Sequence, residues 1–172
     1  MLIRPEQPED VAAIHALVAV AFPSAAEARL IDLLRDAGRL TVSLVAVLPK
    51  GNEHSQIVGH VAFSPVTTPN SDIHRIGVCL APLAVAEESR RQGIGAALVR
   101  AGLEACREHG ANYAVVVGEP EYYGRFGFKP GDRFELTSAY ASPFFQVVEL
   151  TDGGSPRGRG LVKFAPEFDI FG

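Results

Sequence analysis

Cysteine is scarce in this sequence of 172 residues, and no metal-binding or redox motif occurs in it. The two cysteines, Cys79 and Cys106, stand far apart rather than at the close spacing of zinc or disulfide-exchange motifs. We therefore expect two buried thiols in a reducing compartment. The five histidines also form no ligand pattern such as His-Glu-x-x-His, so the sequence predicts no metal cofactor.

Long apolar runs and an excess of positive charge are also missing. The longest apolar run near the start, residues 16–22, is far shorter than the ~20 residues that cross a bilayer. Arg4, Glu6, Glu9 and Asp10 stand where a signal peptide needs an apolar core. A net charge of −4 gives no positive field for a phosphate backbone. We expect a cytoplasmic protein whose partners are neither membranes nor nucleic acids.

The composition is typical of one folded domain. Apolar residues make up 47% and charged residues 21%, close to the average of globular proteins. A chain of this length can bury a sizeable core without dividing into two units. No internal repeat, linker or low-complexity segment interrupts it. The sequence therefore predicts a single domain that spans residues 1–172.

Hydrophobic spacing predicts two helices near the start of the chain. The first begins at Pro8 and ends before Pro23, because apolar residues recur between them at three and four positions. The second follows Ser24 and ends at Gly38. Ser24 and Glu27 have the spacing of a capping box, in which each side chain bonds the backbone of the other.

Strands are predicted where β-branched and apolar residues run between turn signals. We expect an edge strand at residues 2–4, an antiparallel pair at 40–48 and 57–66, a polar loop at 67–74, strands at 75–85 and 113–117, and a closing hairpin of 144–150 with 160–164. Pro82 lies inside one of these strands, where it removes a backbone donor and indicates a bulge. Such a bulge leaves N–H and C=O groups free to pair with an extended ligand.

The most distinctive stretch, Arg90-Arg91-Gln92-Gly93-Ile94-Gly95, joins a strand to a predicted helix that ends at Gly110. Glycines allow close approach to the main chain, and the free amides at a helix start attract phosphate. A dinucleotide-binding turn needs a third glycine where this chain has Leu98, and no Gly-Lys-Ser/Thr of a nucleotide-triphosphate loop occurs. Glycine spacing alone is also typical of an ordinary tight turn.

Two motifs together resemble a known family. The pattern Arg/Gln-x-x-Gly-x-Gly/Ala after an apolar strand is similar to the acyl-CoA signature of the GNAT superfamily of N-acetyltransferases. Further along, Tyr123, Gly127 and Phe128 match the family's tyrosine followed four residues later by Gly-Phe. The resemblance covers nearly the whole chain and is greatest to a bacterial branch of predicted acetyltransferases. It is specific for acyl-CoA binding and gives no information about the acceptor.

This resemblance implies an α/β fold with a mixed, mostly antiparallel sheet of six or seven strands flanked by helices. Strands 75–85 and 113–117 would be parallel neighbours that diverge around the pantetheine arm. Acetyl-CoA is the implied co-substrate. The implied CoA-binding residues are Leu83, Ala84 and Val85 on the strand, Arg90 as a charge near the phosphates, and Arg91, Gln92, Gly93, Ile94, Gly95 and Ala96 in the loop.

The implied reaction is direct transfer of an acetyl group to a primary amine. Such an amine is only about one part in a thousand neutral at pH 7, so it needs a base or desolvation. The departing thiolate needs a proton donor, for which the motif indicates Tyr123. Tyr122 points about 100° away on the same helical turn and cannot share the site. Glu27 is the candidate base, with His60, Glu119 or a water chain as alternatives.

Two other functions are also compatible with the sequence. The chain is either the amine acetyltransferase described above, the same enzyme with another short acyl-CoA, or a non-catalytic acyl-CoA-binding sensor or interaction module. A covalent route through a cysteine is disfavoured, because neither cysteine lies in a nucleophile motif. We expect a monomer or a homodimer. The apolar tail, residues 164–171, either closes the fold or forms a partner surface.

Overall fold

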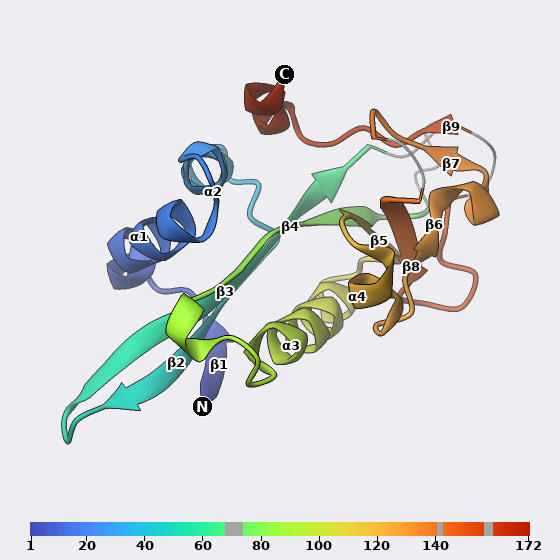
Figure 1. The fold of residues 1–172 in the computed structure, drawn as a ribbon. Coiled ribbons are helices and arrows are strands. Elements are labelled where there is room, and N and C mark those ends of the chain that lie inside the picture. The colour runs from blue at the N-terminus through green and yellow to red at the C-terminus, as the bar shows by residue number, and fades with distance from the viewer. Residues whose placement is uncertain (68–73, 141–142, 157–159) are drawn as a thin grey trace.

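The computed structural model describes residues 1–67, 74–140, 143–156 and 160–172 (Figure 1). Its strands are β1 (Leu2–Pro5), β2 (Val42–Lys50), β3 (His54–Val66), β4 (Gly77–Val85), β5 (Tyr113–Val117), β6 (Lys129–Pro130), β7 (Leu136–Thr137), β8 (Phe145–Glu149) and β9 (Gly160–Leu161). Its α-helices are α1 (Val11–Ala21), α2 (Ala26–Asp36), α3 (Ile94–Glu108) and α4 (Pro120–Gly124). Short 3-10 helices are η1 (Pro8–Asp10), η3 (Glu87–Ser89), η4 (Gly131–Phe134) and η5 (Pro166–Phe171). Of the predicted polar loop at 67–74, residues 68–73 lie outside the described part.

Seven strands form one sheet in the order β1-β2-β3-β4-β5-β8-β6. Every neighbouring pair is antiparallel except β4 with β5, which are parallel. The predicted edge strand, the antiparallel pair β2–β3 and the seven-stranded mixed sheet are therefore confirmed. The sheet carries α1 and α2 on one face and α3 on the other (Figure 1).

The predicted closing hairpin is wrong. β8 pairs with β5 and β6 in the main sheet, whereas β9 pairs in parallel with β7 in a separate two-stranded sheet. Phe145 and Val147 of β8 are fully buried in a cluster with Tyr113 and Val115 of β5. This apolar contact, which is distant in sequence, outweighs the local turn signals that favoured the hairpin.

Alternate residues of β2 supply the two faces of the core. Val45 and Val47 pack against α1 and α2, while Leu44 and Ala46 belong to the cluster that contains α3. The prediction of α3 is confirmed from Ile94 onward, and Gly110 follows its end with a φ of +94°. α3 lies close to the sheet because Gly102 has no Cβ; an added one would meet the Phe63 ring at 2.3 Å.

The predicted capping box at the start of α2 is also wrong. The N-cap is Ala25, not Ser24, and the N-cap residue makes no side-chain hydrogen bond. The Ser24 Oγ accepts a hydrogen bond from the amide of Ala26 at 3.2 Å. Glu27 thus occupies the second helical position rather than the third, and its carboxylate is not committed to the helix start.

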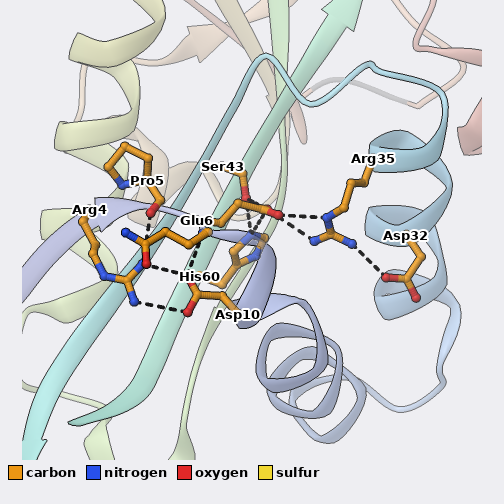
Figure 2. A network of polar contacts seen from close by, with 9 residues as sticks. Arg4, Pro5, Glu6, Asp10, Asp32, Arg35, Ser43 and His60 are labelled. Atoms are coloured by element: carbon orange, nitrogen blue, oxygen red, sulfur yellow. Dashed lines mark hydrogen bonds and ion pairs between the residues drawn. The ribbon is translucent and has the colours of Figure 1, made fainter.

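A polar network fixes α2 against the sheet (Figure 2). The Arg35 Nε on α2 donates to Glu6 Oε2 at 2.8 Å, and a second guanidinium nitrogen donates to Asp32 at 3.0 Å. The Ser43 hydroxyl of β2 donates to Glu6 and contacts the His60 Nε2 of β3 at 2.8 Å. Glu6 directly follows β1, Ser43 lies on β2 and His60 lies on β3. The network therefore connects α2 to three neighbouring strands and holds the helix in a defined position.

Candidate active site

A bulge and a divergence open the sheet at β4. Opposite β3, Leu80 pairs with Phe63 and Leu83 with Val61, so β4 carries one extra residue at Ala81-Pro82, a cis peptide. On its other side β4 pairs with β5 only from Gly77 to Cys79. The predictions of a bulge at Pro82 and of parallel neighbours that diverge are both confirmed. Backbone groups of the second half of β4 have no strand partner on that side.

The loop after β4 presents a row of free amides. Gly93 lies in the left-handed region with a φ of +80°, and so does Arg91 with a φ of +63°. The first helical bond of α3 runs from the Ala97 amide to the Gly93 carbonyl at 3.0 Å. Within the described residues, the amides of 91–96 donate to no acceptor. The positive end of the helix dipole and these donors suit an anionic group.

Arg90 stands at the junction between β4 and this loop. Its Nε donates to the Val85 carbonyl at 3.1 Å, which ties the loop to the end of the strand. The guanidinium thus contacts the main chain of one expected CoA-binding residue. Leu83 and Val85 pack toward α3, whereas the side chain of Ala84 is buried against α1 and α2.

A pocket of about 260 Å³ lies where β4 leaves β5. Its lining comes from β4, from the end of β5, from α2, from α4 and from the C-terminal segment. The lining residues are Phe22, Glu27, Leu30, Cys79, Leu80, Ala81, Pro82, Leu83, Val117, Tyr123, Tyr140, Phe164, Phe168 and Phe171. The structure therefore brings the predicted donor, Tyr123, and the candidate base, Glu27, to one pocket.

Glu27 is the one charged side chain among the described lining residues. Its Oε2 is buried and has no hydrogen-bond partner within the described part of the chain. A buried carboxylate oxygen without a donor is costly, so an oxygen in this state is suited to receive a ligand's N–H group.

Tyr123 is held between the pocket and the core. Its ring packs edge to face on Phe128, with centroids 5.8 Å apart, and covers Gly118, where a Cβ would meet the ring at 2.5 Å. Burial, together with the nearby Tyr122 and Cys79, raises the pKa of this phenol well above its ordinary value. The hydroxyl therefore keeps its proton at neutral pH.

The other predicted candidates lie elsewhere. His60 is fully buried in the network of Figure 2, and burial lowers its pKa to about 4, so the imidazole is neutral. Glu119 is the exposed N-cap residue of α4. Neither lines the pocket. The thiols of Cys79 and Cys106 are buried, as expected, and burial raises the pKa of each to about 12, which makes them poor nucleophiles.

Sequence reasoning missed the aromatic residues that the C-terminal segment contributes. Phe164, Phe168 and Phe171 reach the pocket from more than forty positions beyond Tyr123 in the sequence. The tail closes the fold, because Phe168 packs with Leu30 and Leu34 of α2. The accumulation of phenylalanine in residues 164–171 was the available signal.

The described residues hold neither a cluster of metal-ligating side chains nor a membrane-spanning helix. No group of three or more His, Cys, Asp or Glu side chains is placed to hold a metal ion. Among the described helices, none combines the length and the apolar character needed to cross a bilayer.

Known proteins match this arrangement along nearly the whole chain. The model of the Acetyltransferase (GNAT) family matches residues 9–128. An uncharacterized N-acetyltransferase of Escherichia coli K12, YhbS, is 39% identical over 99% of this chain and 100% of its own length. A second from the same organism, YjhQ, is 33% identical over 78% of this chain and 71% of its own.

Solved structures agree with this match. The crystal structure of Escherichia coli YhbS in complex with CoA has a TM-score of 0.89, at 39% identity, over 99% of this chain and 93% of that one. A GNAT family acetyltransferase from Brucella melitensis in complex with acetyl-CoA has a TM-score of 0.78, at 33% identity, over 98% and 97%. By sequence and by structure, the chain belongs to the GNAT family of acetyltransferases.

Proposed function

We propose that this protein transfers an acetyl group from acetyl-CoA directly to a primary amine. The observation that carries the proposal is the pocket at the divergence of β4 from β5, which holds both Tyr123 and Glu27. A proton donor and a proton acceptor at the end of an unpaired strand are what an acyl transfer to an amine requires.

The residues that would hold acetyl-CoA follow from the free backbone groups. The amides of 91–96 would bind the pyrophosphate, and the main chain of Leu83 and Val85 would pair with the amides of the pantetheine arm. Arg90 would keep Val85 in place while adding positive charge near the phosphates. Relatives with known structures contain CoA or acetyl-CoA, which supports this assignment. When bound, acetyl-CoA supplies an acyl group activated as a thioester.

The chain's own groups would then move the protons of the reaction. An ammonium that enters the pocket loses water, which lowers its pKa, and Glu27 Oε2 accepts the proton. A main-chain N–H near Leu83 or Val85 would stabilise the negative charge that develops on the carbonyl oxygen. As the C–S bond breaks, Tyr123 would donate its proton to the departing sulfur, and the second proton that the nitrogen loses when the amide forms would return to the Tyr123 oxygen. We also propose that the protein acts in the cytoplasm, because Cys79 and Cys106 are free thiols and free thiols are typical of a reducing compartment.

Two measurements test the proposal separately. Titration calorimetry of the ligand-free protein with CoA and acetyl-CoA should give heat with each. Release of free thiol from acetyl-CoA in the presence of a panel of amines should exceed the release without an amine. Absence of heat with both compounds would contradict the CoA site. Heat without amine-dependent thiol release would favour the acyl-CoA sensor, and faster release from propionyl-CoA would favour another short acyl donor.

A further inference from the structure

We propose that the acceptor is a small primary amine on an apolar body, with no second charge. This inference rests on the proposed transfer to an amine and names the class of amine. It is carried by the contrast between one unpartnered carboxylate oxygen and the aromatic side chains that surround it in the same pocket.

The aromatic side chains form a continuous wall. Tyr140 stacks on Phe164 with ring centroids 5.6 Å apart, Phe164 lies 5.3 Å from Phe168, and Phe168 lies 6.3 Å from Phe171. Phe22, at the end of α1, adds a further ring to the lining. A wall of this kind gains free energy by removing an apolar body from water, and its ring faces offer an uncharged polar body no hydrogen-bond partner.

The charges in the described lining of the pocket favour a ligand with one cationic group and no anionic group. Glu27 is the one charged residue in the described lining, so a single ammonium finds an opposite charge there. A second ammonium would find no second carboxylate in the described lining, and cation–π contacts of about 0.5–2 kcal/mol would not offset the hydration that it loses. A carboxylate on the ligand would meet no cation and would lie near Glu27. Polyamines and free amino acids are therefore poor fits.

The size of the pocket limits the acceptor further. About 260 Å³ is below the roughly 300–1,000 Å³ of pockets that take drug-sized ligands. Residues 79–83 of β4 and Val117 of β5 belong to the lining, so part of this space is needed for the acyl group. The remaining volume suits a short alkyl chain or a single ring rather than a sugar-based antibiotic.

Matched pairs of amines test this proposal. 2-Phenylethylamine and L-phenylalanine differ by one carboxylate, and n-pentylamine and 1,4-diaminobutane differ by a methyl group in place of an ammonium. Binding to the CoA-loaded protein is measured by calorimetry, and kcat/KM by thiol release from acetyl-CoA. We expect the first member of each pair to exceed the second at least about tenfold in both measurements. Glu27→Gln should weaken the binding of 2-phenylethylamine by a similar factor.

A charge added to the wall should change the preference. Phe171 is 40% exposed, so Phe171→Asp is compatible with folding and brings a second carboxylate to the pocket. We expect this variant to favour 1,4-diaminobutane relative to n-pentylamine. Val20→Asp, at an exposed apolar position of α1 outside this pocket, is the matched control and should keep the original preference.

The outcomes separate this inference from the proposed function. Binding of 2-phenylethylamine that depends on Glu27, without thiol release, would retain the amine class and overturn the transfer. Thiol release with 1,4-diaminobutane or L-phenylalanine at least equal to that of its partner would retain the transfer and overturn the amine class. The amine class is also overturned if no tested amine binds the CoA-loaded protein.

Discussion

Tyr122 and Tyr123 are adjacent in sequence, but their rings stand at 84° to each other with centroids 4.9 Å apart. The Tyr122 hydroxyl lies 2.8 Å from where a Cβ on Gly95 would be, at the start of α3, whereas the Tyr123 ring covers Gly118 and lines the pocket. Arg125 packs over the Tyr122 ring, 4.5 Å from its centroid. The two phenols therefore belong to different parts of the site.

This division predicts different effects for two conservative substitutions. Tyr123→Phe removes the proposed proton donor and should lower kcat by roughly 100-fold or more, with little change in CoA affinity. Tyr122→Phe removes a hydroxyl outside the pocket lining and should leave kcat largely unchanged. Thiol release gives kcat, and calorimetry gives the affinity for CoA. Equal losses of kcat in the two variants would contradict the role of Tyr123.

The left-handed glycine before α3 offers a second test. Gly93→Ala should cost about 1 kcal/mol of stability, because a Cβ is unfavourable at a φ of +80°. Relief of this strain moves the amides of the loop, so CoA affinity should fall at least about tenfold, or roughly 1.4 kcal/mol. Gly110→Ala, at a φ of +94° beyond the other end of α3, should cost similar stability and leave CoA affinity unchanged. Urea denaturation and calorimetry measure the two quantities; a loss of affinity in Gly110→Ala would point to general destabilisation.

The ion pair between Arg35 and Glu6 should contribute to stability. Arg35→Ala leaves the largely buried Glu6 carboxylate without its cation, and we expect the free energy of unfolding to fall by about 1–3 kcal/mol. Arg107→Ala is the control, because its pair with Glu104 on α3 is half exposed and solvated. Urea denaturation should show no clear change for Arg107→Ala. A negligible effect of Arg35→Ala would mean that the network does not stabilise α2.

His60 predicts how stability depends on pH. Burial lowers its pKa to about 4 from the ordinary 6.5, so the unfolded chain binds this proton more readily than the folded protein. The stability that His60 contributes is therefore complete above pH 6.5 and is lost as the pH falls toward 4, by on the order of 3 kcal/mol. Hydrogen bonds from Arg35 and Ser43 outweigh burial and lower the pKa of Glu6, whose own contribution is lost only below about 4.5.

Urea denaturation between pH 7 and 5 isolates the imidazole. The free energy of unfolding of the natural protein should fall over this range, and that of His60→Gln should fall less. Equal slopes for the two proteins would show that His60 titrates as an exposed histidine does.

Local sequence patterns correctly predicted the elements that are specified by residues close together in the chain. The run of β-branched residues at β5 and the spacing of Ile94 and Leu98 gave those elements correctly, and Pro82 indicated the bulge. The pairing of β8 with β5, and of the two-residue strands β7 and β9, depends on contacts between distant residues. No local period contains that information, so turn residues suggested a hairpin that does not form.

The site divides in the same way. The loop at Gly93 is one segment, so its free amides could be predicted from the sequence alone. Glu27 could be chosen as a candidate base but not placed, because its position depends on where α2 begins and on the contacts of Arg35 with Glu6. The aromatic wall needs residues from both ends of the chain, such as Phe22 and Phe168, and only the folded structure joins them.

The parallel contact of β4 with β5 spans three residue positions, Gly77–Cys79 against Tyr113–Val115. Four strands lie on one side of this short seam and three on the other, and α3 lies across both. The sheet thus consists of a four-stranded part and a three-stranded part that, among the described residues, are hydrogen-bonded to each other over this short stretch alone. An extended ligand with amide groups, laid along the open stretch of β4, would form the backbone hydrogen bonds that β5 does not form there, and would lengthen the edge along which the two parts of the sheet are joined.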